Sequence, residues 1–204
     1  MNGDNEQYFS RPPPFMRQTA ETLAVLDDRL RGLLRDYARR EPAHDALAAE
    51  FGTLLDDPED SFRRERLAGH FTASCWLVSA DGQRLLLTHH RKLQRWLQLG
   101  GHADGDRDLA QVALKEAEEE SGLSGLVLED PAIFDLDKHW IPERKDVPGH
   151  WHYDVRFVIR ALGGEAFVPS EESLDLAWRP VTEVAADPES DESMQRMARR
   201  WLAR

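Results

Sequence analysis

The chain of 204 residues has little sulfur chemistry and no long apolar segment. Its single cysteine, Cys75, excludes an internal disulfide, and the apolar residues 73–78 around it indicate a thiol packed in a buried strand. No apolar run approaches the ~20 residues that a membrane-spanning helix needs. Residues 1–6 also lack the basic-then-apolar pattern of a secretory signal. We therefore expect a cytoplasmic protein that does not bind a membrane.

Basic residues are scarce relative to acidic ones. The chain has 26 Lys and Arg against 38 Asp and Glu, which gives a formal net charge of -12. Such a protein repels the backbone of a long nucleic acid unless its basic residues cluster, so we expect no nucleic-acid partner. A small phosphorylated ligand is compatible with this charge, because a bound divalent cation reverses the sign of the field in an acidic pocket.

The residue patterns divide the chain into three segments. Residues 1–16 are polar, contain three consecutive prolines and predict a flexible arm. Residues 17–68 predict a helical N-terminal extension, and residues 69–204 predict a catalytic domain. We see no internal repeat.

Leucines recur at helical spacing in the extension, from Leu23 to Leu34. The predicted helices of this segment cover residues 19–40, 43–55 and 62–67. The leucine stripe needs a partner surface: it could cap a substrate cleft, form a homodimer interface or pack on the chain's own core.

Beyond residue 69 the pattern changes to short β-like runs interrupted by helices. The predicted strands cover residues 71–79, 84–89, 126–128, 132–140, 150–162 and 176–180, and the predicted helices cover residues 108–121 and 192–203. Gly122 stands where the first helix needs a left-handed cap. Because strands and helices do not alternate, we predict an α/β fold of the α+β type, with a mixed β-sheet sandwiched between helices.

Three glutamates share one side of the predicted helix at residues 108–121. At ~100° per residue, Glu119 lies about 60° to one side of Glu116 and Glu120 about 40° to the other. The adjoining side carries small or apolar residues that would let the helix dock on a sheet: Ala110, Ala113, Leu114 and Ala117. Three close carboxylates repel one another unless a cation neutralises them, and magnesium prefers such oxygen ligands. The alternative is a solvated acidic surface.

The segment from Gly101 to Leu123 resembles the signature of the Nudix hydrolases, G-x5-E-x7-R-E-U-x-E-E-x-G-U. The positions in register are Gly101, Glu116, Ala117, Glu119, Glu120, Gly122 and Leu123. Lys115 stands where the signature has arginine, and it could pair with Glu119 one turn further on. Arg107 replaces the first glutamate of the signature, and neighbouring aspartates could compensate for this loss: Asp104, Asp106 and Asp108.

The resemblance covers residues 69–185 and implies a metal-dependent hydrolase that cleaves a phosphoanhydride bond in a nucleoside diphosphate derivative. Nucleotide sugars, ADP-ribose-like compounds and dinucleotides are the substrates it implies. Mg²⁺ or Mn²⁺ would be held by Glu116, Glu119 and Glu120, with Glu119 or Glu120 also acting as the catalytic base and Gly101 providing a backbone contact. Bound metal would lower the pKa of an attacking water.

Two other functions remain open at this stage. The replacement at Arg107 is compatible with a catalytically weakened Nudix-like module that binds nucleotides or regulates another process. The other function is that of an isomerase, because enzymes of this fold that isomerise isoprenoid diphosphates combine histidine and glutamate metal ligands with a catalytic cysteine. Cys75 would then have to lie in the active site.

A second group of candidate residues lies in the segment 150–157. As a strand, this segment would place four polar residues on one face: His150, His152, Asp154 and Arg156. We expect this face to bind the substrate, with Arg156 as a phosphate clamp, because a guanidinium forms two parallel hydrogen bonds to phosphate. The alternative is an exposed sheet face.

Two further features of this region have more than one interpretation. With His102 and His139, the histidines of the segment could form a second metal site, although the His-x-His spacing alone is nonspecific. Three tryptophans could stack on a nucleotide base or lie in the core: Trp96, Trp140 and Trp151.

Overall fold

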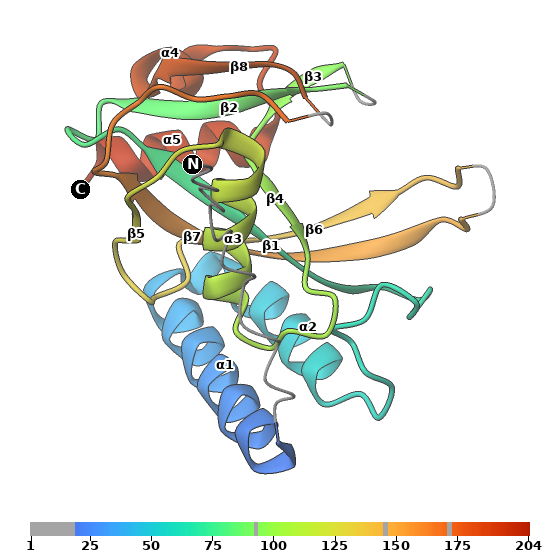
Figure 1. Ribbon diagram of the computed structural model, residues 1–204. Helices are drawn as coiled ribbons and strands as arrows, with labels where there is room; N and C mark the ends of the chain where they lie inside the picture. Colours follow the sequence, from blue (N-terminus) through green and yellow to red (C-terminus); the bar gives the residue numbers. More distant parts are fainter. Residues whose placement is uncertain (1–18, 92–93, 145–146, 171–172) are drawn as a thin grey trace, which may run out of the picture.

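The computed structural model describes residues 19–91, 94–144, 147–170 and 173–204. In this part of the chain a mixed β-sheet lies between two groups of helices, which confirms the predicted fold class (Figure 1). The predicted flexible arm, residues 1–16, lies outside the described residues. Among the described helices, none is both long enough and apolar enough to cross a membrane.

The N-terminal extension contains two of the three helices that its sequence predicts. They are α1 (Ala20–Arg40) and α2 (Asp45–Leu55), joined by a short 3-10 helix, η1 (Pro42–His44). The prediction of a helix at residues 62–67 is wrong, because this segment forms a series of turns. Its backbone forms hydrogen bonds with other segments of the chain: the carbonyl of Phe62 accepts a hydrogen bond from the N–H of Gly105 at 2.8 Å.

The sheet has eight strands among the described residues. They are β1 (His70–Val78), β2 (Arg84–His90), β3 (Arg95–Leu97), β4 (Gly100–His102), β5 (Leu126–Leu128), β6 (Asp135–Ile141), β7 (His150–Ala161) and β8 (Ser173–Pro180). Strand order is β3-β2-β1-β7-β5, and β4 pairs with β1, β6 with β7 and β8 with β2. β1 and β7 run parallel at the centre, and the other pairs are antiparallel. In Figure 1 the hairpin of β6 and β7 extends beyond the other strands.

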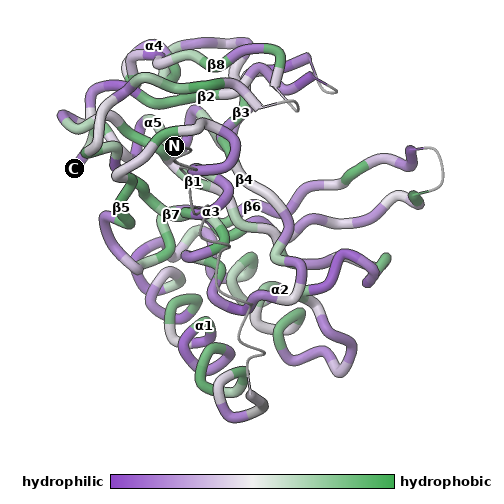
Figure 2. Tube along the Cα trace, in the orientation of Figure 1, coloured by the Kyte–Doolittle hydropathy of each residue, from purple (hydrophilic) through white to green (hydrophobic). Residues whose placement is uncertain are grey.

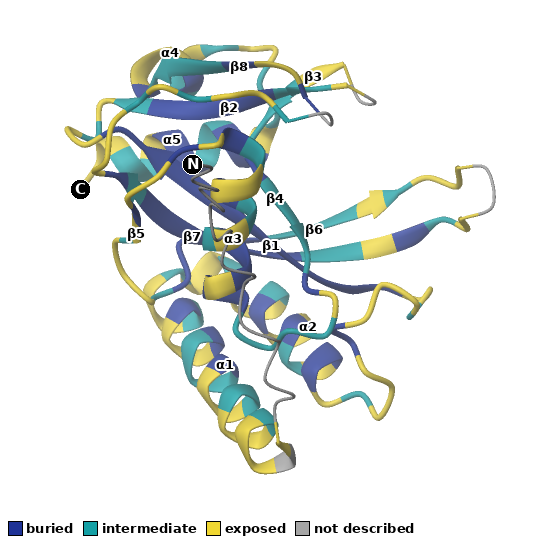
Figure 3. Cartoon of the chain, viewed as in Figure 1, coloured by how far each residue is buried: buried dark blue, intermediate teal, exposed yellow. Residues whose placement is uncertain are grey.

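Two hydrophobic cores lie on opposite faces of this sheet, because successive strand residues point to opposite sides. Phe71, Ala73 and Cys75 of β1 belong to the core shared with α1, α2 and α3 (Leu109–Ser121). Trp76 and Val78 face the second core, which α4 (Val181–Ala186) and α5 (Glu192–Leu202) cover. Figure 3 shows β1 and the inner part of β7 buried between these layers.

The cysteine is part of the first core, as its apolar neighbours predict. Cys75 is 1% exposed, and burial raises the pKa of its thiol well above the usual range. A thiol in this state is neither accessible nor ionised, so it does not supply the catalytic cysteine that the isomerase interpretation requires.

The helical extension packs on the chain's own core, which is one of the three interpretations of its leucine stripe. Leu30 and Leu34 of α1 are buried in the same cluster as the sheet residues. Phe51 of α2 is fully buried, with its ring centroid 6.1 Å from that of Phe71 and 5.2 Å from that of Tyr153. Figure 2 shows hydrophobic and hydrophilic residues alternating along α1, as expected of a helix with one buried side.

Replacing Phe51 by Ala should destabilise the whole protein, because it leaves a cavity in a core shared by the extension and the sheet. We expect the free energy of unfolding to fall by about 3–5 kcal/mol. Urea unfolding followed by tryptophan fluorescence measures this loss. Val25→Ala on the exposed side of α1 is the control and should change stability by no more than about 0.5 kcal/mol. Two separate unfolding transitions, with only the first affected by Phe51→Ala, would contradict a shared core.

Candidate active site

Helix α3 carries the three predicted glutamates and docks on the sheet through small side chains. Asp108 caps its first turn by accepting a hydrogen bond from the N–H of Gln111, and Gly122 ends it with a left-handed φ of 66°. The docked side includes three buried alanines: Ala110, Ala113 and Ala117. Both the predicted left-handed cap and the predicted docking side are therefore confirmed.

The glutamate side of α3 meets the sheet at β4. A Cβ atom added to Gly101 would lie 2.5–2.7 Å from the carboxylate atoms of Glu116. Only glycine lets that carboxylate lie against the strand backbone at this distance. Glu119, one turn further on, is exposed, and its Oε1 lies 3.6 Å from Nζ of Lys115, which confirms the expected pair. Glu120 is half-buried on the same side of the helix.

These donors fit a hard divalent cation. The glutamate side offers carboxylate oxygens, which are the ligands that Mg²⁺ and Mn²⁺ prefer. The close approach of Glu116 to Gly101 also adds backbone polar groups beside the carboxylate. Glu116, Glu119 and Glu120 are therefore the residues that could hold such an ion by donor type, whereas among the described residues only a group of histidines brings three ligand atoms within 4.8 Å of one another.

Arg107 joins the helical extension to the loop before α3. Its Nη1 donates to both carboxylate oxygens of Asp27 in α1, at 2.7 and 2.6 Å. Its Nη2 lies 3.4 Å from Oδ1 of Asp60, and its guanidinium carbon lies 4.7 Å from the ring centroid of Phe62. The side chains of Arg107 and Asp27 are each only 18% exposed, so the pair is largely shielded from solvent.

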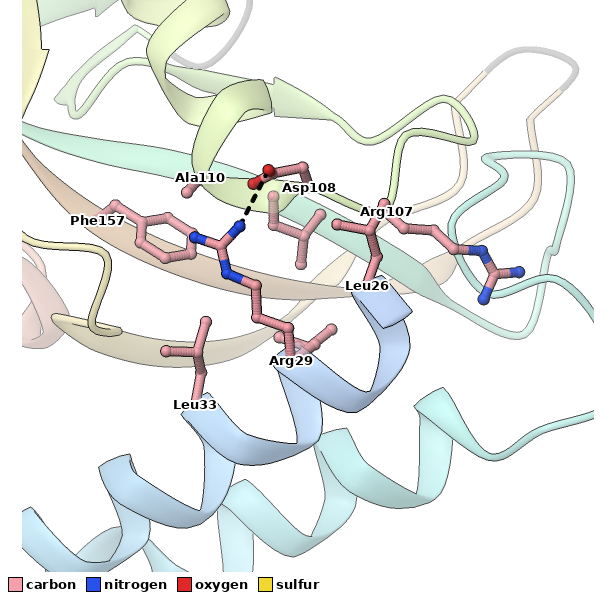
Figure 4. A pocket seen from close by; sticks show the side chains of 9 residues that line it. Leu26, Arg29, Leu33, Arg107, Asp108, Ala110 and Phe157 are labelled. Carbon is pink, nitrogen blue, oxygen red and sulfur yellow. Dashed lines mark hydrogen bonds and ion pairs between the residues drawn. The ribbon is translucent and has the colours of Figure 1, made fainter. Parts of the chain in front are cut away.

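The aspartates considered as substitutes for the missing glutamate bind groups of the loop and the extension. Asp104 forms an ion pair of 2.5 Å with Arg64, and Asp106 accepts a hydrogen bond of 3.0 Å from the N–H of Asp108. Asp108 caps α3 and pairs with Arg29 of α1 at 3.3 Å, as Figure 4 shows. These contacts fix the conformation of the loop.

A shallow hollow lies between α1 and the start of α3. Its walls include Leu26 and Leu33 of α1, the cap residue Asp108, Ala110 of α3 and Phe157 of β7 (Figure 4). Apolar side chains form most of these walls. None of the three glutamates lines this hollow. It lies where α1 packs on the domain, and it is not the candidate active site.

The polar face of β7 is buried, which makes the interpretation as an exposed sheet face wrong. Arg156 is 2% exposed and its guanidinium forms ion pairs with Asp154 at 2.8 Å, Asp137 at 3.2 Å and Asp135 at 3.3 Å. Asp154 in turn accepts hydrogen bonds from Thr72 and Ser74 of β1. Because the guanidinium is surrounded by these protein partners, the structure favours a structural role for Arg156 over the predicted phosphate clamp.

Five histidines gather at the end of the same polar face. His150 and His152 of β7 lie beside His70 of β1, whose ring centroid is 5.0 Å from both of theirs. His102 and His139 each contact His152, with centroid distances of 5.0 and 5.4 Å. Burial, together with the neighbouring charges, lowers the pKa of His152 to about 2 and that of His102 to about 4.

His70 is the member of this cluster that the sequence did not indicate. It stands alone at the start of a strand, with no nearby histidine along the chain. The parallel pairing of β1 with β7 places it opposite His152. That pairing depends on the topology of the sheet, which residue spacing does not reveal.

The tryptophans do not share one environment. Trp96 is half-buried and stacks on His89, with ring centroids 5.1 Å apart. Trp140 and Trp151 are 51% and 37% exposed on the β6–β7 hairpin, where they contact each other edge to face. For these two residues the interpretation as core packing is wrong.

Comparison with known proteins identifies the same region. A family model described as "NUDIX domain" matches residues 69–201. An Ap4A hydrolase from C. elegans is 16% identical, with 65% of this chain and 95% of that chain covered and a TM-score of 0.50. A MutT protein from Methanosarcina mazei Go1 is 16% identical, with 68% and 96% covered and a TM-score of 0.51. A NUDIX-family hydrolase from Clostridium perfringens is 21% identical, with 66% and 96% covered and a TM-score of 0.50.

At these identities the solved structures establish a common fold and nothing finer. No curated protein is significantly similar in sequence to this chain.

Replacing Gly101 by Ala should impair the glutamate site without unfolding the protein. The new Cβ would displace the carboxylate of Glu116, which is the end of a flexible side chain and can move away. We expect the affinity for Mg²⁺ or Mn²⁺ to fall roughly 10–100-fold, as when the groups that position metal ligands are lost. Isothermal titration calorimetry with Mn²⁺ measures the change. Gly32→Ala is the control, because it adds a Cβ in open space on α1 and should leave metal affinity unaltered.

Proposed function

We propose, from the premise that this chain belongs to the NUDIX domain family and is a Nudix-type pyrophosphohydrolase, that it hydrolyses a nucleoside diphosphate derivative with the help of Mg²⁺ or Mn²⁺. The family match confirms the resemblance of residues 101–123 to the Nudix signature. The observation that carries the proposal is the placement of Glu116 against Gly101, with Glu119 and Glu120 on the same side of α3.

Each residue has a distinct part in this proposal. Glu116, Glu119 and Glu120 bind the ion, and the absent side chain of Gly101 gives Glu116 its position. Glu119 or Glu120 accepts the proton of the attacking water. When bound, the ion offsets the charge of the pyrophosphate and lowers the pKa of that water. Lys115 pairs with Glu119 and limits the directions in which its carboxylate can point.

The replacement at Arg107 does not remove any of these carboxylates. Its ion pairs with Asp27 and Asp60 hold the loop before α3 against the extension. We infer that the extension supplies the support that the missing glutamate would otherwise give. This inference favours an active enzyme over a catalytically weakened binding module.

The substrate classes under consideration are dinucleotides, ADP-ribose-like compounds and nucleotide sugars. The similar fold from C. elegans belongs to an Ap4A hydrolase, which supports placing a dinucleoside polyphosphate first in a substrate panel. The net charge of -12 favours a small substrate over a nucleic acid. We expect this reaction to take place in the cytoplasm.

The test is turnover of a substrate panel with Mg²⁺ or Mn²⁺, comparing the wild-type protein with Glu119→Gln/Glu120→Gln. The panel contains dinucleoside polyphosphates, ADP-ribose, nucleotide sugars and nucleoside triphosphates. Loss of the base and of two ligands should lower kcat by at least the roughly 10²–10⁴-fold that general acid–base catalysis contributes. Liquid chromatography of the products identifies the bond that is cleaved.

Glu118→Gln is the matched control, because it makes the same chemical change at an exposed position on another side of α3. Its kcat should equal that of the wild-type protein. Circular dichroism must show that the double variant is folded. Turnover that persists in the folded double variant would contradict the assignment of the glutamates, and no turnover of any substrate by the wild-type protein would favour a binding module.

A further inference from the structure

Three histidines from two strands form a compact group of nitrogen ligands outside the glutamate site. His70, His150 and His152 each place one ligand nitrogen within 4.8 Å of the others. The Nε2 atoms of His150 and His152 are 3.2 Å apart. Zinc bonded to two imidazoles at ~2.0–2.1 Å with tetrahedral geometry would separate their nitrogens by about 3.3 Å. The separation of these two nitrogens therefore already matches that of two ligands of a tetrahedral zinc ion.

Backbone carbonyls fix the tautomers of His70 and His150, and a bound metal would replace the hydrogen bond between Nε2 of His150 and Nε2 of His152. Nδ1 of His150 lies 2.8 Å from the carbonyl oxygen of Pro148, and Nδ1 of His70 lies 3.2 Å from that of Arg66. A carbonyl can only accept, so Nδ1 carries the proton in both rings and Nε2 carries the lone pair. Metal-binding histidines are held in this way, with the second ring nitrogen donating to a carbonyl or carboxylate.

His70 has a buried nitrogen that the protein leaves without a partner. The residue is 1% exposed, and its Nε2 has no hydrogen-bond partner in the described part of the chain. A buried polar atom without a hydrogen bond costs about 1–3 kcal/mol. A metal ion bound to this lone pair would remove the cost.

The surrounding rings favour a cation that accepts neutral nitrogen ligands. His70 and His150 are buried and His102 and His152 are half-buried, so the cluster offers imidazole nitrogens that are largely shielded from solvent. His139 lies at the outer side of the cluster, 40% exposed, and its Nδ1 is 3.0 Å from Asp137. Imidazole suits zinc, iron, copper and nickel, whereas magnesium prefers oxygen.

This group is separate from the glutamate site. Gly101 and His102 are consecutive residues of β4 and therefore point to opposite faces of the sheet. The Gly101 side meets Glu116, and the ring of His102 contacts His70 and His152. The two clusters lie on different faces and offer different donor atoms.

We propose that His70, His150 and His152 form a binding site for a divalent transition-metal ion of the zinc class, with His102 as the adjacent fourth ring. The two central strands, β1 and β7, then hold the ion across their parallel pairing. This site does not depend on the proposed hydrolysis, and it is occupied by a different metal from the one that the glutamates bind.

The test is a titration of the full chain carrying Glu119→Gln/Glu120→Gln with Co²⁺, so that the glutamate site contributes little. We expect one equivalent to bind with the visible d–d absorption of a site with nitrogen ligands, and Zn²⁺ to displace it. Adding His150→Ala or His152→Ala to this background should weaken binding by more than the ~10–100-fold that loss of a supporting group costs. The control is His89→Ala, because His89 stacks on Trp96 outside the cluster; this change should leave the affinity for Co²⁺ unaltered.

X-ray absorption at the zinc edge keeps the test independent of whether the histidine variants fold. The Zn²⁺-loaded Glu119→Gln/Glu120→Gln protein should show the multiple scattering of imidazole rings. A first shell of oxygen alone, absence of stoichiometric binding, or Co²⁺ binding that is unchanged in folded His150→Ala and His152→Ala would each overturn the proposal. None of these readouts requires catalytic turnover, so failure of the proposed hydrolysis is detected separately.

Discussion

The ion pair between Arg107 and Asp27 connects the helical extension to the loop that positions the glutamate helix. Arg107 stands at a signature position where a glutamate is expected, and its guanidinium reaches α1 instead of the carboxylates of α3. Arg29–Asp108 and Arg64–Asp104 connect neighbouring points of the same loop to the extension. The loop is thus held by contacts from outside the family domain, and we propose that these contacts compensate for the replacement.

Charge is distributed differently on the two faces of the sheet. On the face covered by α1, α2 and α3, the carboxylate of Glu116 lies against Gly101 beside an otherwise apolar contact, and Glu119 and Glu120 stand on the same side of α3. On the other face, Arg156 and Arg196 compensate the buried Asp135, and β7 also carries His150 and His152. The two metal sites that we propose therefore lie on opposite faces of one sheet and offer oxygen and nitrogen ligands, which suit different classes of metal.

Local patterns were enough to predict most elements, because the long helices and the central strands have clear hydrophobic periods. The glutamate side of α3 and the cap at Gly122 also depend only on helical geometry, so their relative positions could be predicted. The strands β3 and β4 could not be predicted, since each is short and, unlike the apolar β5, contains charged, polar or glycine residues. The turns at residues 62–67 were also missed, because their backbone bonds depend on distant segments.

The parts of the sites that were not predicted all depend on long-range pairing. Asp27 meets Arg107 from 80 positions away in the chain, and His70 meets His152 through the register of two parallel strands. Arg156 looked available for phosphate because its partner Asp135 comes from another strand. Alternation along β7 placed its polar residues on one face, but only the packing of α5 and β6 determines that this face is buried.

A double-mutant cycle of Asp27→Ala and Arg107→Ala tests most directly whether the extension braces the loop before α3. Each single change should lower the free energy of unfolding by about 1–3 kcal/mol, between the values for exposed and buried ion pairs. The two changes together should cost clearly less than their sum, with a coupling energy of at least about 1 kcal/mol. Urea unfolding measures all four proteins under the same conditions. Additive effects would show that Arg107 and Asp27 stabilise the protein independently and would contradict this account.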